Sequence, residues 1–311
     1  MLWLISRIRS RGTRETSLQC NEKTMKTIGG MAKAVPPHEK TVSHEARKMT
    51  KDALIDDKDN LFLQIIPKRT LESVYLSDSV YRPCAELLDE MEHRDLLREK
   101  NMEPRNKLLM VGTPGNGKTT LAEALAGELD YPLYIVRYDN IMSDDIGKSA
   151  DRLGKVFDAV KGKRCALFFD EFDTIGKSRN DQHDNSEFKR LVSSLLVQID
   201  HLSTDVLVMA ATNLESALDN AAWRRFQIKV QLERPQREDL TRWFIDYEKK
   251  HGFEFGVPAE ELAESVYGKS YSDAEELGQS IYRQMIIHPD EDPEEITRRQ
   301  MRFHKHQKNI F

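Results

Sequence analysis

The sequence is poor in cysteine and has no long apolar run. Its three cysteines, Cys20, Cys84 and Cys165, are scattered and form neither a metal-binding spacing nor a disulfide framework. This usage is typical of a reducing compartment, so we expect a cytoplasmic protein. No apolar stretch approaches the length that a membrane span needs. The sequence therefore predicts a chain that works without a membrane.

An excess of positive charge is also missing. Lys and Arg total 47 against 52 for Asp and Glu, which gives a net charge of −5. Proteins that bind nucleic acid usually present a basic face, so this balance argues against such a partner. At 311 residues, of which 39% are hydrophobic, the chain is long enough for one large domain or two modest ones.

A glycine-rich motif in residues 107–126 dominates the rest of the sequence. Residues 112–119 (GTPGNGKT) fit G-x-x-x-x-G-K-[ST], after an apolar strand predicted at 108–111 and before a helix predicted from residue 120. Glycines let backbone N–H groups turn towards phosphate oxygens, and the helix adds its positive N-terminal end. The context disfavours the alternative, an ordinary glycine turn before a helix. We predict that ATP is held by Thr113, Pro114, Gly115, Asn116, Gly117, Lys118, Thr119 and Thr120.

Within this loop two side chains have distinct predicted roles. Lys118 would reach the β- and γ-phosphates, and the Thr119 hydroxyl would ligate Mg²⁺. A second candidate for Mg²⁺ is Asp170, which follows an apolar strand predicted at residues 166–169 and is next to Glu171. Unpaired carboxylates are costly to bury. Beside a phosphate loop, Asp170 would hold the ion and Glu171 would polarise the attacking water; alone, the pair would indicate a solvated strand end.

Three further polar residues follow later strands. Asn213 comes directly after a strand predicted at residues 206–210, where an amide can contact the γ-phosphate or the lytic water; asparagine at such a place is otherwise a turn former. Arg224 and Arg225 precede a strand predicted at residues 228–230. Paired arginines in a charged chain are more often plain surface residues, and the residues alone do not assign them a role.

Strands and helices alternate from residue 61 to residue 234, which predicts an α/β fold: a parallel sheet with helices on both faces. Beyond Pro235, helices predicted at 237–250, 258–267 and 272–287 form a small α-helical domain. We expect a flexible arm over residues 1–60, the large α/β domain over 61–234, a helical lid over 235–290 and a charged tail over 291–311. Residues 65–71, just before the phosphate loop, are a candidate for adenine contact.

Five segments, GTPGNGKTT, LFFDE, AATN, LDNAAWRRF and SYSDAEEL, resemble in this order the motifs of AAA ATPases. The resemblance covers residues 67–287 and implies a RecA-like domain with a helical lid. It also implies a ring of identical subunits, usually a hexamer, with ATP bound between subunits. On this resemblance Asn213 corresponds to the sensor residue that contacts the γ-phosphate. Arg224 and Arg225 correspond to arginine fingers that reach the nucleotide of the neighbouring subunit.

One segment departs from the family pattern. Members that thread polypeptide usually carry an aromatic–hydrophobic–glycine pore loop, but here Asp145 stands where the aromatic residue is expected, followed by Ile146 and Gly147. An acidic side chain cannot grip an extended peptide by apolar contact, so the sequence argues against threading. A second pore segment, residues 177–189, is polar.

The chain is also similar to short bacterial AAA ATPases encoded beside a subtilisin-like protease, through its compact layout and the segments RTLESV and HRDLLRE. Three functions follow. The first is Mg²⁺-dependent ATP hydrolysis that remodels a protein partner. The second is a slow ATP-dependent switch that regulates an associated protease. The third is a DNA-associated loader, which the absence of a basic face disfavours.

Overall fold

The computed structural model of the chain describes residue 57 and residues 59–142, 146–172, 185–213 and 220–307. Residues 1–56 and 58 of the predicted N-terminal arm lie outside these residues, as do the pore residue Asp145 and the second pore segment up to residue 184. In the described part of the chain, no helix is both long and apolar enough to cross a membrane.

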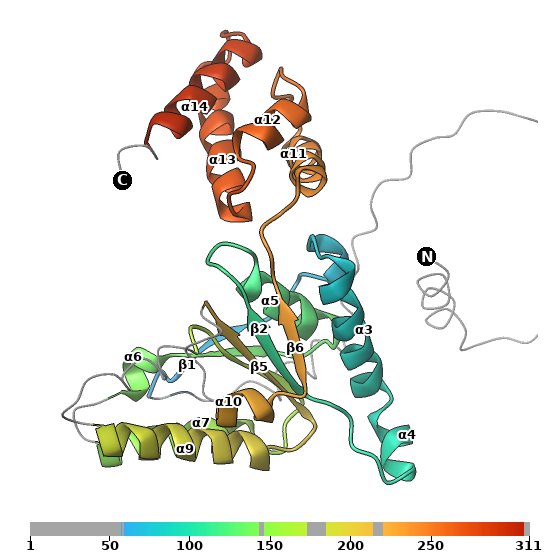
Figure 1. Cartoon of the computed structure of the whole chain (residues 1–311), viewed down its shortest axis with the longest axis vertical. Helices are drawn as coiled ribbons and strands as arrows, with labels where there is room; N and C mark the ends of the chain where they lie inside the picture. Colours follow the sequence, from blue (N-terminus) through green and yellow to red (C-terminus); the bar gives the residue numbers. More distant parts are fainter. Residues whose placement is uncertain (1–56, 58, 143–145, 173–184, 214–219, 308–311) are drawn as a thin grey trace, which may run out of the picture. The chain divides into compact units, whose positions relative to one another are not determined.

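A six-stranded sheet forms the centre of the large domain (Figure 1). Its spatial order is β1-β3-β4-β5-β2-β6, and every neighbouring pair is parallel except the antiparallel edge pair β1–β3. The strands are β1 (Phe62–Ile65), β2 (Lys107–Val111), β3 (Leu133–Val136), β4 (Cys165–Phe169), β5 (Val206–Thr212) and β6 (Ile228–Gln231). The predicted α/β fold with a parallel sheet is confirmed, and the structure adds β1 as an antiparallel edge strand.

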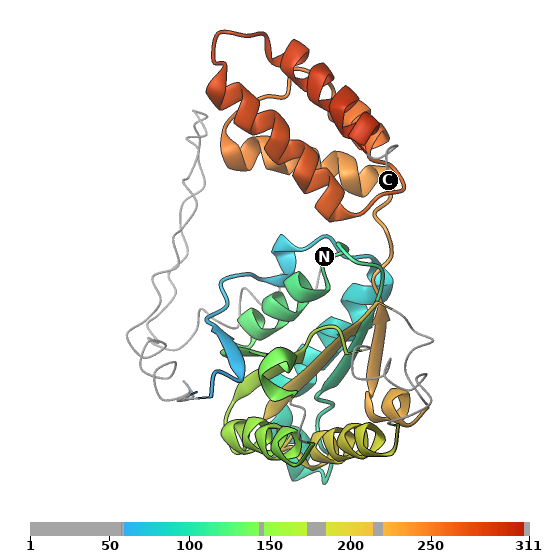
Figure 2. The same cartoon turned by 90° about the vertical axis from the view of Figure 1, so that its left-hand side faces the viewer.

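Side chains of the central strands alternate between two buried clusters, as the pleat of a strand requires. In β2, Leu109 and Val111 enter one cluster with residues of α7 (Ile146–Val160) and α9 (Asn185–His201). Leu108 and Met110 enter the other cluster with residues of α3 (Asp78–Glu92) and α5 (Lys118–Glu128). The predicted helices on both faces are therefore present, and the two views of the ribbon show them on opposite sides of the strands (Figures 1 and 2).

Shorter elements complete this domain. They are the 3-10 turn η1 (Leu71–Ser73) and the helices α4 (Arg94–Glu99), α6 (Tyr138–Ile141) and α10 (Asn220–Arg225). Both cysteines in the described residues, Cys84 and Cys165, are buried free thiols. Burial raises the pKa of each thiol to about 12, so both act as small apolar core residues.

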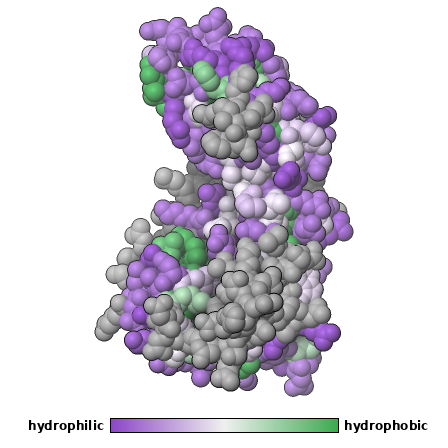
Figure 3. Space-filling view, turned by 60° about the vertical axis from the view of Figure 1, so that its left-hand side comes forward, coloured by the Kyte–Doolittle hydropathy of each residue, from purple (hydrophilic) through white to green (hydrophobic). Residues whose placement is uncertain are grey.

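The helical lid consists of α11 (Arg237–His251), α12 (Ala259–Ser265), α13 (Tyr271–Ile287) and α14 (Pro293–Gln307). Their buried side chains form a third cluster, which includes Leu240, Phe244 and Ile281. Helix α14 lies in the stretch predicted as a charged tail, yet its Ile296 is 1% exposed within this cluster. The outer surface of the lid is mostly hydrophilic in the space-filling view (Figure 3), in keeping with a chain of which 32% of residues are charged.

Candidate active site

The predicted phosphate loop lies between β2 and α5. Helix α5 begins at Lys118, directly after Gly117, whose φ of +84° is the left-handed conformation that glycine adopts without strain. The helix therefore starts two residues earlier than expected. Its unsatisfied N–H groups and the positive end of its dipole face the loop, an arrangement suited to phosphate.

Two other glycines of the loop are needed because neighbours approach closely. A Cβ atom on Gly112 would lie 2.4 Å from the carbonyl oxygen of Leu232, so this glycine lets the strand end pack against the chain leaving β6. Gly115 has a φ of +79°, and a Cβ there would lie 2.7 Å from Oγ of Ser270 in the lid. The Ser272 N–H also donates to the Gly115 carbonyl at 3.1 Å. The lid therefore touches the phosphate loop directly.

Lys118, the charged residue of the loop, is enclosed, with 7% of its surface exposed. Its Nζ donates to the carbonyl oxygens of Gly112 at 2.7 Å and Thr113 at 3.2 Å, and to Oδ1 of Asn213 at 2.7 Å. The ammonium is thus held inside the loop by oxygens, where it can exchange an acceptor for a phosphate oxygen. Asn213, separated from it by 95 positions, is brought to the same point.

The two predicted Mg²⁺ ligands are neighbours. Oγ1 of Thr119 donates to Oδ2 of Asp170 at 2.9 Å. A hydroxyl and a carboxylate are oxygen ligands of the kind that Mg²⁺ prefers, and Mg²⁺ usually keeps several waters besides. The donor set fits the ion.

Glu171 stands beside this pair in an unusual backbone conformation. Its φ is +49°, in the left-handed region that side chains other than those of Asn and Asp rarely adopt. Its N–H donates to Oδ1 of Asp170 at 2.9 Å, and its side chain is exposed. Strain of this kind persists where the surroundings impose it and often marks functional residues. The positive φ of Glu171 turns the chain sharply at the end of β4.

The paired arginines do not join this group in the same chain. Both end helix α10, where Nε of Arg225 lies 2.9 Å from Oδ2 of Asp200 on α9 and Arg224 is exposed. Neither lines the pocket that contains the phosphate loop.

That pocket has a volume of about 840 Å³ and brings together residues from both domains. From the large domain come Lys118, Thr119, Asp170, Glu171 and Asn213. The remaining wall is formed by the segment before the loop and by the lid. Sequence reasoning singled out only its SYSDAEEL segment, which supplies Tyr271, Ser272 and Glu275. The members that it missed include Ser73, Val74, Tyr75, Trp243, Asp246, Tyr247 and Gln279.

Direct contacts fix part of the missed wall. The Tyr75 hydroxyl donates to Oδ2 of Asp246 at 2.7 Å, and its ring stacks on Tyr271 with centroids 5.8 Å apart. Burial, and for Tyr75 also the hydrogen bond to Asp246, raises the pKa of both phenols, so both remain neutral donors. Of the residues 65–71 predicted to contact adenine, only Arg69 lines the pocket. Trp243 and Tyr247 are four residues apart, a spacing that places both on one face of a helix. This spacing could have indicated the aromatic wall from the sequence.

Comparison with known proteins gives a consistent result. Residues 108–234 match the family model described as "ATPase family associated with various cellular activities (AAA)". The chain is 34% identical over 224 residues to an uncharacterized AAA family ATPase, y4kL, of Sinorhizobium fredii, a match that covers 72% of this chain and 67% of that protein.

Longer relatives match over a similar length of the chain. The ATP-dependent zinc metalloprotease FtsH of Marinobacter nauticus is 31% identical over 217 residues, covering 67% of this chain and 34% of that protein. A cell division cycle protein 48 homolog of Archaeoglobus fulgidus is 32% identical over 218 residues, covering 68% of this chain and 30% of that protein. The similarity therefore extends over only about a third of each of these two proteins.

Proposed function

Because this chain belongs to the AAA ATPase family and is an ATP-binding hydrolase, we propose that it uses Mg²⁺-dependent ATP hydrolysis to remodel or regulate a protein partner. The observation that carries this proposal is the meeting of Lys118, the Asp170–Glu171 pair and Asn213 at the ends of three adjacent strands. Ligands of open α/β sheets bind at the carboxyl ends of the strands.

Each residue has a defined task in this proposal. The loop N–H groups and Lys118 bind the phosphates of ATP. Thr119 and Asp170 would hold Mg²⁺, which neutralises charge on the phosphate oxygens when bound. The Glu171 carboxylate accepts a proton from a water whose oxygen bonds to the γ-phosphorus. The bond from that phosphorus to the bridging oxygen breaks, and ADP and phosphate leave. Asn213 orients the water or the γ-phosphate.

We place the adenine against the aromatic wall of the pocket. Val74, Tyr75, Trp243 and Tyr247 line the same pocket as the phosphate loop residues, and aromatic faces suit a nucleobase. The residues just after the predicted stretch 65–71 would therefore contact the base. Because the lid supplies part of this wall and also touches Gly115, nucleotide binding would hold the lid against the large domain.

The arginine pair supports a ring of identical subunits, which we propose to be a hexamer. Arg224 is exposed, and Arg225 forms a partly exposed ion pair with Asp200. Ion pairs of this kind contribute little to folding, so we propose that Arg225 exchanges Asp200 for the γ-phosphate of the neighbouring subunit.

The energy of hydrolysis would act on a protein partner. A relative is named an ATP-dependent zinc metalloprotease. We infer that this chain either remodels a protein or regulates a protease, such as a subtilisin-like one. Asp145 in place of the pore aromatic favours the slow regulatory switch over threading. The buried free thiols Cys84 and Cys165 support a reducing, cytoplasmic setting.

The catalytic part of this proposal is tested with Lys118→Ala in the full chain. We expect the wild type to release phosphate from ATP and the variant to lose both nucleotide binding and turnover, measured with a fluorescent ATP analogue and a phosphate assay. Lys161→Ala, at an exposed lysine after α7, is the matched control and should behave as the wild type. A Lys118→Ala protein that folds and still binds and hydrolyses ATP would contradict the assignment.

A further inference from the structure

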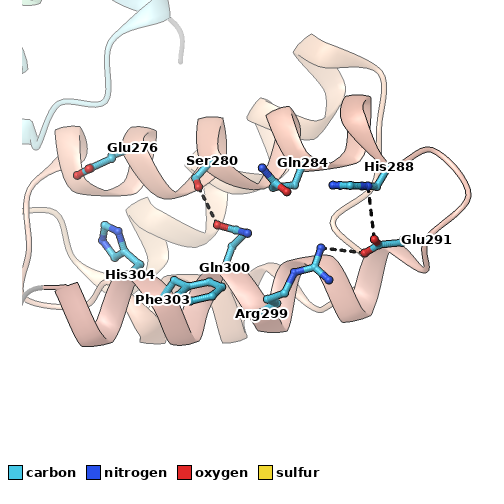
Figure 4. A pocket seen from close by; sticks show the side chains of 9 residues that line it. All are labelled: Glu276, Ser280, Gln284, His288, Glu291, Arg299, Gln300, Phe303 and His304. Carbon is cyan, nitrogen blue, oxygen red and sulfur yellow. Dashed lines mark hydrogen bonds and ion pairs between the residues drawn. The ribbon is translucent and has the colours of Figure 1, made fainter.

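A second cavity lies in the lid, away from the phosphate loop. It has a volume of about 560 Å³ and runs between α13 and α14. Figure 4 shows Glu276 and His304 on the two facing helices at one end of this groove, while His288 and Glu291 form an ion pair at the other. None of these residues lines the nucleotide pocket.

Three potential metal-binding side chains converge at the Glu276 end. Asp273 and Glu276 are three residues apart on α13, a spacing that places both on one face of a helix. His304 reaches them from α14. One carboxylate oxygen from each acid and one ring nitrogen of the histidine all lie within 4.8 Å of one another.

His304 supplies an independent reason to expect a ligand. It is 8% exposed, and its Nε2 atom has no hydrogen-bond partner among the residues that the structure describes. A buried polar nitrogen without a partner is costly, so native structures usually satisfy it. A metal ion bound by the lone pair of Nε2 would remove this cost, because neutral imidazole is a common metal ligand.

The surrounding charges are compatible with a cation. Burial and the charge of Lys269 lower the pKa of His304, and the charge of Glu276 opposes this change. The carboxylates of Asp273 and Glu276 carry two negative charges, and Lys269 carries one positive charge, so one negative charge is left to attract a cation.

We propose that Asp273, Glu276 and His304 bind a divalent transition metal ion of the zinc class. An imidazole nitrogen favours zinc-like ions over Mg²⁺, for which oxygen ligands are typical. Zinc bonds to nitrogen and carboxylate oxygen are about 2.0–2.2 Å long, so ligand atoms around one ion lie roughly 3–4 Å apart. The exposed Glu276 side chain can rotate to close the observed spacing, and water would complete the coordination.

The ion would link the lid to the phosphate loop. Oδ2 of Asp273 accepts hydrogen bonds from the backbone N–H of Ser270 at 2.9 Å and from its hydroxyl at 2.6 Å. Two residues further on, Ser272 donates to the Gly115 carbonyl. A metal bound by Asp273 would therefore fix the start of α13, where the lid meets the loop, and join it to α14.

Cobalt(II) titration of the full chain, after chelator treatment and without nucleotide, tests the proposal. We expect one Co²⁺ to bind with visible absorption bands that Zn²⁺ displaces. The Thr119–Asp170 pair offers only oxygen ligands, which give weak bands in octahedral geometry, so the two sites are distinguishable. His304→Ala should abolish the bands, and Glu276→Gln should weaken binding at least about tenfold, the smaller loss seen on altering the surroundings of a metal site. His288→Ala, at the far end of the same groove, should leave binding unchanged.

Three results would overturn the site. The first is wild-type binding in a folded His304→Ala variant, which would mean that Co²⁺ binds adventitiously elsewhere. The second is unchanged affinity in Glu276→Gln. This variant decides the case in which circular dichroism shows that His304→Ala misfolds, because Glu276 is exposed and its amide form leaves the lid core intact. No Co²⁺ binding by the wild-type chain would also contradict it.

Discussion

The carboxylate of Glu171 owes its position to a single turn of the backbone. The positive φ of this residue and the hydrogen bond from its N–H to Asp170 bend the chain where β4 ends. Asp170 is thereby directed to Thr119, and Glu171 is left exposed in the pocket. Adjacent carboxylates of one chemical type can thus perform different tasks.

Replacing Glu171 by Gln should separate binding from chemistry. The amide keeps the size of the side chain but cannot accept a proton, so ATP should still bind while turnover falls by about 10²–10⁴-fold, the usual contribution of a general base. Binding is measured with labelled ATP, and turnover by phosphate release. Glu99→Gln, at an exposed glutamate of α4 outside the pocket, is the control. Undiminished turnover in Glu171→Gln would remove this residue from its role.

At the scale of elements, helix α14 shows how a charged sequence can belong to a core. Its exposed face carries the acidic and basic residues that suggested a tail, but Ile296 is fully enclosed and the Thr297 hydroxyl donates to the Phe255 carbonyl at 2.7 Å. Two arginines, Arg298 and Arg299, pair with Glu261 and Glu291 at its surface. The helix is thus anchored to α12 and the loop after α11, and the hydrogen bond from the Ser280 hydroxyl to Oε1 of Gln300 ties it to α13.

Ile296→Ala tests whether α14 is part of the lid. Truncating a buried isoleucine to alanine usually costs about 2–5 kcal/mol, so the amides of the lid should lose protection by at least tenfold in hydrogen exchange of the full chain. Phe303→Ala on the same helix is the matched control, because Phe303 is 57% exposed and exposed substitutions change stability by only about 0.5 kcal/mol. If the lid amides of Ile296→Ala keep the protection seen in Phe303→Ala and in the wild type, α14 is not needed for the stability of the lid.

For the whole molecule, the proposed ring makes the rate of hydrolysis depend on assembly. If the arginines of one subunit complete the site of the next, the rate per subunit should rise steeply with protein concentration. Light scattering in the presence of ATP gives the mass at each concentration. A rate that stays constant and very low for a monomer would instead favour the switch that awaits a partner.

Arg225→Ala addresses the shared site directly. We expect turnover to fall by about 10³-fold or more, as when other arginine fingers are removed, with ATP binding retained. Asp200→Ala is a control for the ion pair: it breaks the Arg225–Asp200 contact while keeping the arginine, and it also removes the Lys107–Asp200 ion pair. Wild-type turnover in Arg225→Ala would contradict action on a neighbouring subunit.

The phosphate loop, the Asp170–Glu171 strand end and the parallel α/β architecture were predictable from the sequence, because each depends on local spacing: glycines before a helix, or carboxylates after an apolar strand. The structure confirms the fold and brings Lys118, Thr119, Asp170 and Asn213 together; their catalytic roles stay predictions.

Only the tertiary structure decided which distant residues meet. The aromatic wall joins Tyr75 to Asp246, 171 positions apart, and the groove of the lid joins α13 to α14. These contacts depend on how buried faces pack, and side chains such as Tyr75 and His304 have the same local sequence signals as ordinary core or surface residues. Local patterns therefore determined the phosphate-binding half of the site, and packing determined the half contributed by the lid.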